Sequence, residues 1–384
     1  MPRINGNGGV TGSINKPLYY ATTGIWSLLD VEANKRSGQW PSAIGTISVI
    51  VPCAGGNNVA AYPFTPGTGF GTRYAAPATI PAGSGRSSVF HPSGTDIIIG
   101  SQSNSPWIQA YPWSSNGFGT KYSDPTTTPG YDVTSLTMHT TGQAIVGTLT
   151  GGNNMIGYRY AVGVGIGNTY SNPATLPQGT GGYTAAFSPS GADVYVSSNA
   201  SPYHQAYPFN VTSGFGTKYV TPSGGPSSTT TGVTFNTTGS DAIYGYIGGS
   251  SPYYGIFPFT SGSGFGTKYS GSTNADGAVY CCGFSPNGSN IAMGLNTTVR
   301  VNFYTYSNGS GPGSKYSNVI PTTLSRATYG VTWSPNGNDF FFGDGGTPFV
   351  QAWTWSGGVG TKYNNPASLP EGNCQGIATA AVAV

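Results

Sequence analysis

Short apolar runs separated by polar turns recur along residues 45–384. A typical unit has an apolar segment, a turn such as FSPSG starting at Phe187, and a second apolar segment over 193–196. Related turns start at Phe90, Met138, Phe235, Phe284 and Trp333. A strand, a Pro/Gly turn and a second strand make a β-hairpin, so the pattern predicts hairpins throughout this part of the chain.

A hexapeptide that ends in tyrosine sets the period of this repeat. It reads GFGTKY or a close variant, and successive copies lie 47 to 50 residues apart. The copies end at Tyr74, Tyr122, Tyr170, Tyr219, Tyr269, Tyr316 and Tyr363. Two aromatic residues with one residue between them precede each copy, as in Tyr62/Phe64. A spacing of two places both rings on one face of a strand, where we expect them to form the core.

Each period therefore holds four short strands, with the fourth beginning at the GTKY motif. Four-stranded units of this length, repeated radially, predict a β-propeller, and seven copies predict seven blades. A linear solenoid would need polar capping repeats at its ends, and the sequence has none. Residues 377–384 match a first strand, whereas the first repeat begins with a second-type strand at 47–51. We expect the C-terminal strand to pair with the N-terminal strands and close an all-β, seven-bladed propeller.

Residues 1–44 lie outside the repeat and form an N-terminal arm, separate from the propeller at 45–384. A short helix is predicted at about 27–37, with Ser27 and Asp30 as a capping box and Gly38 as the C-cap. A helix of about ten residues is marginal alone in water, so it has to dock, either on its own propeller or on another subunit. The residues expected to anchor or assemble the arm are Trp26, Leu28, Leu29, Arg36 and Trp40.

Charge is scarce and excludes several classes of function. Charged residues make up 7% of the chain, against roughly 25% in an ordinary globular domain. The net charge is +3 and no Lys/Arg run occurs, so no nucleic-acid partner is expected. No stretch approaches the length of a membrane span, and the start lacks the apolar core of a secretory signal.

The residue types that usually carry catalysis occupy repeated or isolated positions. Four aspartates share one slot, two residues after the turn glycine, where we expect them to cap the hairpin backbone: Asp96, Asp193, Asp241 and Asp339. His91 and His139 occupy turn slots, and His204 is isolated. Cys53, Cys281, Cys282 and Cys374 show neither metal spacing nor a disulfide framework, so they are interpreted as small apolar fillers. We predict no catalytic residue, no metal and no cofactor.

Two other patterns suggest contact surfaces. A basic residue fills one slot of the hexapeptide in six repeats: Arg73, Lys121, Lys218, Lys268, Lys315 and Lys362. Such charges protect outer strands from edge-to-edge aggregation, or they form a positive belt for acidic partners. Aromatic residues outside the repeated slots, in loops that enter the third strand, are candidates for stacking on sugar rings: Trp107, Tyr203, Tyr253 and Tyr254.

The segment from Gly24 to Pro41 reads G-x-W-S-L-x-x-V-x-x-x-K-R-x-x-x-W-P and resembles a short segment near the start of virion structural proteins of tailed, particularly aquatic, phages. The resemblance covers about 18 residues and implies a protein assembled into a virion in the host cytoplasm. Its arm would bind other virion proteins, with homo-oligomerisation through the arm as a further expectation. The propeller would be displayed as a capsid decoration, head fibre or tail appendage that touches host surface polysaccharide.

The SPxG turns resemble those of WD-repeat-like and lactonase-like propellers, although the Trp-Asp dipeptide of true WD repeats is absent. This second resemblance concerns the fold more than the function. Two alternatives to a virion protein follow. One is a free-standing propeller that binds proteins or carbohydrates, and the other is a lactonase-like enzyme.

Overall fold

The computed structural model describes residues 45–270, 273–317, 320 and 327–381. The arm at 1–44 lies outside the described residues, and so do the predicted helix at 27–37 and the predicted anchoring residues Trp26, Leu28, Leu29, Arg36 and Trp40. The described ranges contain no helix that is long and apolar enough to cross a membrane.

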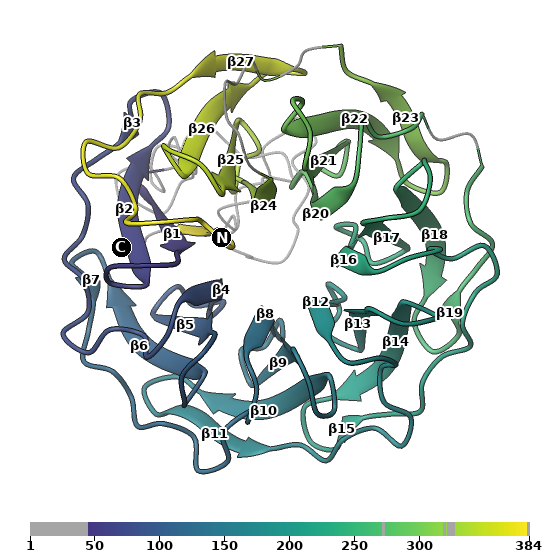
Figure 1. Ribbon diagram of the computed structural model, residues 1–384, viewed down its shortest axis with the longest axis horizontal. Helices are drawn as coiled ribbons and strands as arrows, with labels where there is room; N and C mark the ends of the chain where they lie inside the picture. The colour runs from purple at the N-terminus through teal and green to yellow at the C-terminus, as the bar shows by residue number, and fades with distance from the viewer. Residues whose placement is uncertain (1–44, 271–272, 318–319, 321–326, 382–384) are drawn as a thin grey trace, which may run out of the picture.

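Seven four-stranded antiparallel sheets are arranged around a central axis (Figure 1). Blade 1 contains β28 (Ala378–Ala381), β1 (Ile47–Pro52), β2 (Val59–Thr65) and β3 (Gly69–Phe70). Blade 2 contains β4 (Gly85–Phe90), β5 (Asp96–Ser101), β6 (Ile108–Ser114) and β7 (Gly117–Phe118). Blade 3 contains β8 (Val133–Met138), β9 (Ala144–Leu149), β10 (Met155–Ala161) and β11 (Gly165–Thr169). Blade 4 contains β12 (Gly182–Phe187), β13 (Asp193–Ser198), β14 (His204–Asn210) and β15 (Gly214–Phe215).

The remaining blades repeat this order. Blade 5 contains β16 (Thr230–Phe235), β17 (Asp241–Tyr246), β18 (Tyr254–Thr260) and β19 (Gly264–Phe265). Blade 6 contains β20 (Val279–Phe284), β21 (Asn290–Leu295), β22 (Val301–Ser307) and β23 (Gly311–Lys315). Blade 7 contains β24 (Thr328–Trp333), β25 (Asp339–Asp344), β26 (Val350–Trp355) and β27 (Val359–Lys362). The predicted all-β, seven-bladed propeller is confirmed.

The outermost strand begins earlier than predicted. It starts at the first glycine and the following residue of the hexapeptide, as in Gly69–Phe70, and not at the GTKY motif. The tyrosine nevertheless stays attached to the third strand, because Tyr74 N donates to Ala61 O at 2.9 Å. The whole hexapeptide therefore follows the edge of its blade.

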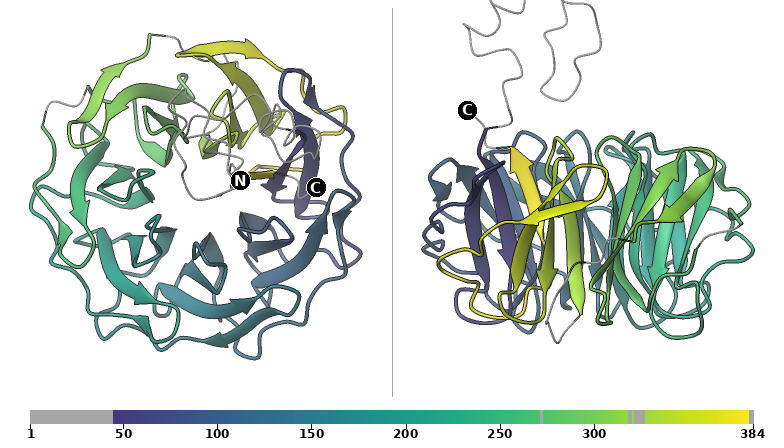
Figure 2. Two further views of the ribbon diagram at one scale, coloured as in Figure 1. Left: turned by 180° about the vertical axis from the view of Figure 1, so that it is seen from behind. Right: turned by 90° about the horizontal axis from the view of Figure 1, so that it is seen from above.

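The ring is closed by the two ends of the described chain, as predicted. β28 pairs antiparallel with β1, with Ile47 opposite Ala381 and Ile50 opposite Ala378. An isolated bridge between Cys53 and Cys374 continues this seam beyond the strands. Residue 45 and residue 381 therefore lie at the same end of blade 1, and Figure 2 shows the yellow β28 beside the purple strands of this blade. The seam sheet has the same four-stranded form as the other six.

The core lies between adjacent blades and is built largely from aromatic side chains. Tyr62 and Phe64 of the third strand are fully buried, as the spacing of the aromatic pairs predicts. Phe64 packs edge-on against Phe341 and Tyr363 of blade 7, with ring centroids 4.7 and 4.9 Å away. Edge-to-face aromatic pairs add about 1 kcal/mol beyond the burial of their area. Blade-to-blade packing of this kind recurs around the ring.

The hexapeptide tyrosine joins its own blade to the next one. Tyr219 of blade 4 donates a hydrogen bond to Asp193 of the same blade at 2.6 Å. Its hydroxyl accepts the Gly262 amide of blade 5 at 2.9 Å. Its ring lies over Gly264, where an added Cβ would come within 2.8 Å of the Tyr219 Cβ. In six of the motifs the first glycine is therefore required by the tyrosine of the preceding blade, because the same contact is present at Gly69, Gly117, Gly165, Gly214 and Gly311.

The repeated aspartates are scaffold residues, but the prediction that they cap the hairpin backbone was wrong. A turn serine caps it in blade 4, where Asp193 N donates to Ser188 Oγ at 3.1 Å. The aspartate side chains instead accept hydrogen bonds from tyrosine hydroxyls. Asp96 accepts the hydroxyl of Tyr122 of its own blade at 3.0 Å and that of Tyr160 of the next blade at 2.8 Å. The pKa of Tyr122 is raised to about 12, mainly by burial and in addition by its hydrogen bond to Asp96. These tyrosines therefore remain neutral donors.

Candidate functional site

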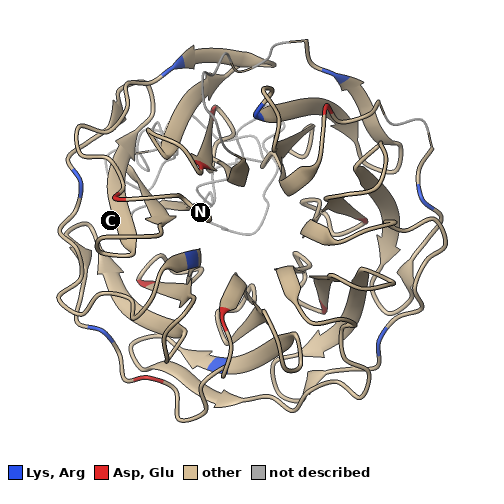
Figure 3. Ribbon diagram, in the orientation of Figure 1, with Lys and Arg blue, Asp and Glu red and all other residues tan. Residues whose placement is uncertain are grey.

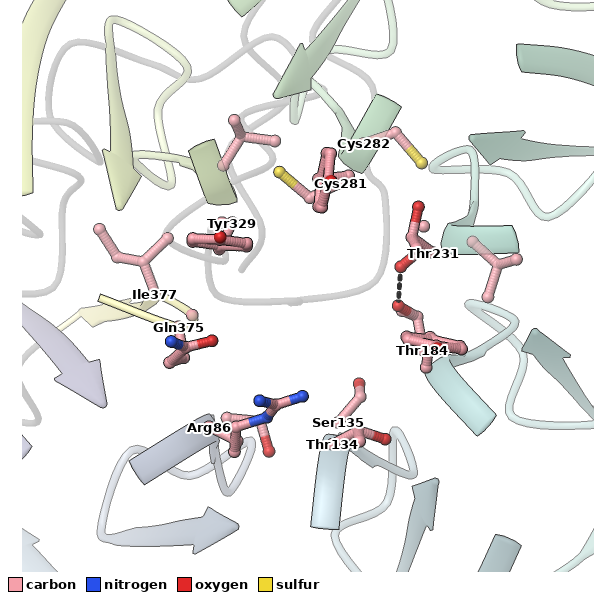
Figure 4. Close-up of a pocket in the computed structure, with 18 of the residues that line it drawn as sticks. Arg86, Thr134, Ser135, Thr184, Thr231, Cys281, Cys282, Tyr329, Gln375 and Ile377 are labelled. Carbon is pink, nitrogen blue, oxygen red and sulfur yellow. Dashed lines mark hydrogen bonds between the residues drawn. The ribbon is translucent and has the colours of Figure 1, made fainter. Parts of the chain in front are cut away.

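A cavity of about 510 Å³ lies on the propeller axis (Figure 4). Every blade contributes to its wall through the early residues of its innermost strand, and blade 1 contributes the segment 375–377 that leads into β28. Seven equivalent segments thus face one space. A volume in this range is typical of sites for small molecules.

A β-bulge near the start of six innermost strands shapes this wall. The register with the second strand shifts between Gly85 and Ser87 in blade 2 and between Val279 and Cys281 in blade 6. Equivalent shifts occur in β8, β12, β16 and β24. A bulge bends its strand and re-aims the extra side chain. Here the bulged positions lie along the cavity wall, and we call them the axial ring: Arg86, Thr134, Tyr183, Thr231, Tyr280, Tyr329 and, in the equivalent place of blade 1, Gln375.

Two members of the axial ring join neighbouring blades. Thr134 Oγ1 donates to Gly182 O of blade 4 at 2.7 Å. Thr231 Oγ1 donates to Val279 O of blade 6 at 2.6 Å. Their hydroxyl protons are used by the scaffold, so they are not available as donors to a ligand.

Three other members of the axial ring offer polar side-chain atoms to a ligand. Tyr183, Tyr280 and Gln375 donate no side-chain hydrogen bond to any residue in the described part of the chain, and Tyr280 meets the ring of Tyr329 edge-on at 5.6 Å. Figure 4 shows the Arg86 guanidinium pointing into the central space. The ring therefore offers donors of several kinds around one positive charge.

Arg86 is the one charged residue among the described residues that line the cavity. Its Nη1 donates to Gln102 Oε1 at 2.8 Å, the single hydrogen bond of this guanidinium within the described ranges. Burial lowers the pKa of Arg86, while the negative charge of Asp132 and the nearby Tyr183 and Tyr329 oppose this shift. An arginine stays protonated at any ordinary pH, so the cavity holds a fixed, partly desolvated cation.

Two cysteines also line the cavity, and burial keeps them inert. It raises the pKa of Cys281 to about 12, and it raises that of Cys282 further. A thiol at such a pKa is protonated at neutral pH and is a poor nucleophile. Cys281 Sγ instead points to Thr328 O of blade 7 at 3.6 Å. The adjacent pair thus behaves as the small filler residues expected from the sequence.

The histidines lie away from the cavity wall. His204 is buried at the start of β14, its Nδ1 is 2.6 Å from the Tyr195 hydroxyl, and burial lowers its pKa to about 3. His91 and His139 bind their own turns through Ser93 and Thr141 at 2.6 and 2.8 Å. Within the described ranges, no three His, Cys, Asp or Glu side chains are grouped so that they could hold a metal ion.

The predicted belt of basic residues runs around the outer rim, as Figure 3 shows. Three of its members form ion pairs with acids of this chain: Arg73 with Glu371 at 3.1 Å, and Lys121 and Lys315 with Asp124 and Asp276, each at 2.5 Å. Lys218 Nζ donates to Tyr219 O and Thr221 Oγ1 at 3.4 and 3.2 Å. Lys268 is half-buried and Lys362 is exposed. Half of the belt is thus neutralised internally, which leaves less charge for an acidic partner.

The aromatic residues proposed for sugar contact lie in the turns between the second and third strands. Trp107, Tyr203 and Tyr253 are half-buried and take positive φ values of 61°, 67° and 64°. Trp107 and Tyr253 pack against the apolar core. Tyr254 is 1% exposed and donates to Thr273 O at 3.0 Å, so its ring has no free face at the surface. These side chains are parts of the turn and the core, and the structure does not bring them together.

The sequence reasoning missed the axial ring because it looked for acids, bases and metal ligands. A signal was nevertheless present in the repeat. The second position of the innermost strand is arginine, threonine or tyrosine in blades 2 to 7, and the equivalent position of blade 1, just before β28, is glutamine. The hexapeptide tyrosine, in contrast, is constant in all seven copies. A position that varies in chemistry on a constant scaffold is where a repeat protein has room for a ligand.

The fold defines a class of protein, a seven-bladed β-propeller, and it is similar to the folds of several solved structures. A solved structure of a candidate 6-phosphogluconolactonase from Bacteroides uniformis is 13% identical, with a TM-score of 0.68, and the match covers 87% of this chain and 99% of that one. The periplasmic gluconolactonase of Pseudomonas aeruginosa is 12% identical, with a TM-score of 0.65 and coverage of 88% and 100%. At such low identity these likenesses concern the fold alone. No protein-family model matches the chain, and no curated protein matches it.

Proposed function

We propose that this chain is a non-enzymatic binding protein of a virion, anchored by its N-terminal arm and displaying the propeller for contact with a ligand. The observation that carries the non-enzymatic part is the chemistry of the axial cavity. Among the described residues that line it, none is an aspartate, a glutamate or a histidine, and its two cysteines are protonated at neutral pH. Hydrolysis of a lactone needs a general base or an activated nucleophile, and the wall supplies neither.

The acids elsewhere in the described chain have structural roles. Asp96, Asp193, Asp241 and Asp339 each accept the hydroxyl of the hexapeptide tyrosine of their own blade, and Asp96 and Asp241 also accept a tyrosine hydroxyl of the next blade. Asp124, Asp276 and Glu371 form ion pairs at the rim. This allocation supports a protein that acts through shape and contact.

Geometry supports display. The axial ring lies near the start of the innermost strands, as the place of Arg86 directly after Gly85 shows. The arm joins the propeller at residue 45, next to the finish of the innermost strand β28, where Ile47 faces Ala381. Residue 45 and the axial ring are thus near opposite ends of the innermost strands, which supports attachment at one end of the propeller and ligand contact at the other. The virion assignment itself rests on the arm segment from Gly24 to Pro41.

The test of this proposal has two parts. The full chain is expected to leave glucono-1,5-lactone and its 6-phosphate hydrolysing at the uncatalysed rate, and hydrolysis above that rate would overturn the non-enzymatic assignment. Light scattering is expected to show assembly of the full chain, alone or with other virion proteins, that the double change Trp26→Ser and Trp40→Ser disrupts while the melting temperature of the propeller is kept. Unchanged assembly would favour a free-standing binding propeller.

A lactonase is the second candidate function, because the fold is shared with the gluconolactonase of Pseudomonas aeruginosa. Arg86 is the cation of the described wall that could polarise a lactone carbonyl, and the same described residues offer it no carboxylate or histidine as a partner base. The hydrolysis assay separates the two candidates directly.

A further inference from the structure

We infer that the axial cavity is a binding site for a monosaccharide-sized carboxylate, such as a uronate unit of an acidic polysaccharide, held through Arg86. This inference rests on the proposed function, since it names the ligand class for the displayed propeller. The charge of the cavity, its donors and its size all suit such a ligand.

The charge of the wall calls for an anion. Arg86 is the one ionised side chain among the described residues that line the cavity. Its single hydrogen bond there, to Gln102, leaves most of the N–H groups of its guanidinium without an acceptor in the described part of the chain. Asp132 acts on Arg86 from a distance, and its Oδ1 accepts the Ser103 amide at 2.7 Å. A planar guanidinium with free N–H groups matches a carboxylate through two parallel hydrogen bonds.

A single positive charge favours a singly charged ligand. A phosphate monoester carries close to two negative charges at neutral pH, and one of them would remain uncompensated beside a partly desolvated wall. Burying an unpaired charge is costly. A carboxylate brings one negative charge to one guanidinium, so its charge is matched.

The remaining free groups suit a polyhydroxylated molecule. Tyr183, Tyr280 and Gln375 line the same cavity, and their side chains donate no hydrogen bond within the described part of the chain. Ser135 Oγ accepts the Ala185 amide at 3.5 Å and keeps its own proton for a ligand. Hydroxyls and amides can both donate and accept, which is what the hydroxyl groups of a sugar need. A cavity of about 510 Å³ accommodates one or two sugar units.

The ligand has to enter without displacing the scaffold. Thr134 and Thr231, whose hydroxyls bridge neighbouring blades at 2.7 and 2.6 Å, keep the ring closed while the other members of the axial ring contact the ligand. The division of the ring into bridging threonines and free donors therefore allows binding without a change of the blades.

Isothermal titration of the full chain with glucuronate, glucose and inorganic phosphate tests the inference. Glucose is the neutral counterpart of glucuronate, and phosphate reports a general anion site. We expect glucuronate to bind at least about tenfold more tightly than glucose or phosphate, because a bidentate charge-assisted pair forms with glucuronate alone. Equal affinity for glucuronate and glucose would overturn the role of the charge, and tighter binding of phosphate would overturn the choice of carboxylate.

Two substitutions with the same change of charge locate the site. Arg86→Gln is expected to weaken glucuronate binding about tenfold or more, while Lys362→Gln, at an exposed rim position, leaves it within about twofold. Equal effects of the two changes, or none from Arg86→Gln, would refute the axial site. The outcomes stay separable from those of the proposed function, because loss of glucuronate binding leaves the hydrolysis and assembly assays unaffected.

Discussion

The contacts between blades and the axial ring are built from the same repeat but follow opposite rules. Between blades, the tyrosine that ends the hexapeptide meets the first glycine of the next motif in blade after blade, as in Tyr219 over Gly264 and Tyr74 over Gly117. In the axial ring, the equivalent slot holds arginine in blade 2, tyrosine in blade 4 and glutamine in blade 1. One region repeats its chemistry, and the other varies it.

This difference separates scaffold from site without any comparison to other proteins. Residues that recur at equivalent places answer a need that every blade has, which is to pack against its neighbours. Residues that differ at equivalent places line the cavity shared by all blades, where they offer several kinds of donor to one ligand. The following predictions are arranged from the largest expected effect to the smallest.

Asp241→Ala is expected to lower the free energy of unfolding by about 3 to 4 kcal/mol, because buried donors lose a charged acceptor. Asp241 accepts the hydroxyls of Tyr269, at 2.8 Å, and of Tyr306, and also the Gly309 amide at 3.2 Å. Chemical denaturation measures the loss. Asp124→Ala is the control, since its ion pair with Lys121 lies at the surface and contributes less than about 1 kcal/mol. A loss as small as that of the control would refute the structural role of the aspartate.

Gly264→Ala is expected to destabilise the propeller by about 2 to 3 kcal/mol, since both backbone strain and a collision with Tyr219 oppose the methyl group. Gly262→Ala is the matched control. The two glycines have φ values of +86° and +84°, but an added Cβ at Gly262 meets nothing within 4 Å. The control is therefore expected to show only the strain of about 1 kcal/mol. Equal melting temperatures for the two variants would contradict the proposed fit of tyrosine over glycine.

Asp344→Asn is expected to stabilise the propeller at neutral pH. Burial raises the pKa of Asp344 to about 6, against the lowering effects of the Gly346 amide and the charge of Arg300. Its folded-state pKa is above its unfolded value, so the folded state keeps a proton that the unfolded state loses, and stability falls as pH rises from about 4 to about 6. Asparagine does not ionise and removes this fall, which amounts to about 2 kcal/mol. Unfolding curves at pH 4 and pH 7 measure it, and a difference between variant and parent that does not grow with pH would contradict the assignment.

Lys315→Ala is expected to change the free energy of unfolding by no more than about 0.5 kcal/mol, because exposed ion pairs contribute little and are screened by salt. The Lys315 and Asp276 side chains are 25% and 35% exposed. Denaturation at low and high salt measures the effect, which should shrink as salt is added. A loss comparable to that of Asp241→Ala would show that the rim charges hold the fold, contrary to the distinction drawn above.

Much of the fold could be predicted because the repeat is written in local signals. The SPxG turns, the aromatic pairs and the 47 to 50 residue period each mark one part of a blade, and the unmatched strands at 47–51 and 377–384 predict the closure. The role of the aspartates could not be predicted in the same way. Their tyrosine partners are 26 residues away in the same blade and 64 residues away in the next, as for Asp96 with Tyr122 and Tyr160, so only the packed ring brings them together.

The candidate site was harder to predict because its residues carry no catalytic signature. Tyrosines, threonines and a glutamine line its wall, and such residues are common throughout this sequence. Their convergence depends on the bulge in each innermost strand, which is a feature of sheet register that no short motif marks. The rim residues Arg73 and Lys121 were predicted as candidate contacts for acidic partners because charge is rare in this chain, yet both form ion pairs within it.

The separation of scaffold from site is tested most directly by the shift of the unfolding midpoint that a fixed, saturating concentration of glucuronate produces in Gly264→Ala and in Arg86→Gln. A ligand that binds only the folded state raises the midpoint by an amount set by its affinity. The account predicts that Gly264→Ala starts from a lower midpoint and keeps the full shift, while Arg86→Gln starts near the parent midpoint and loses the shift. Loss of the shift in Gly264→Ala, or its retention in Arg86→Gln, would contradict the account.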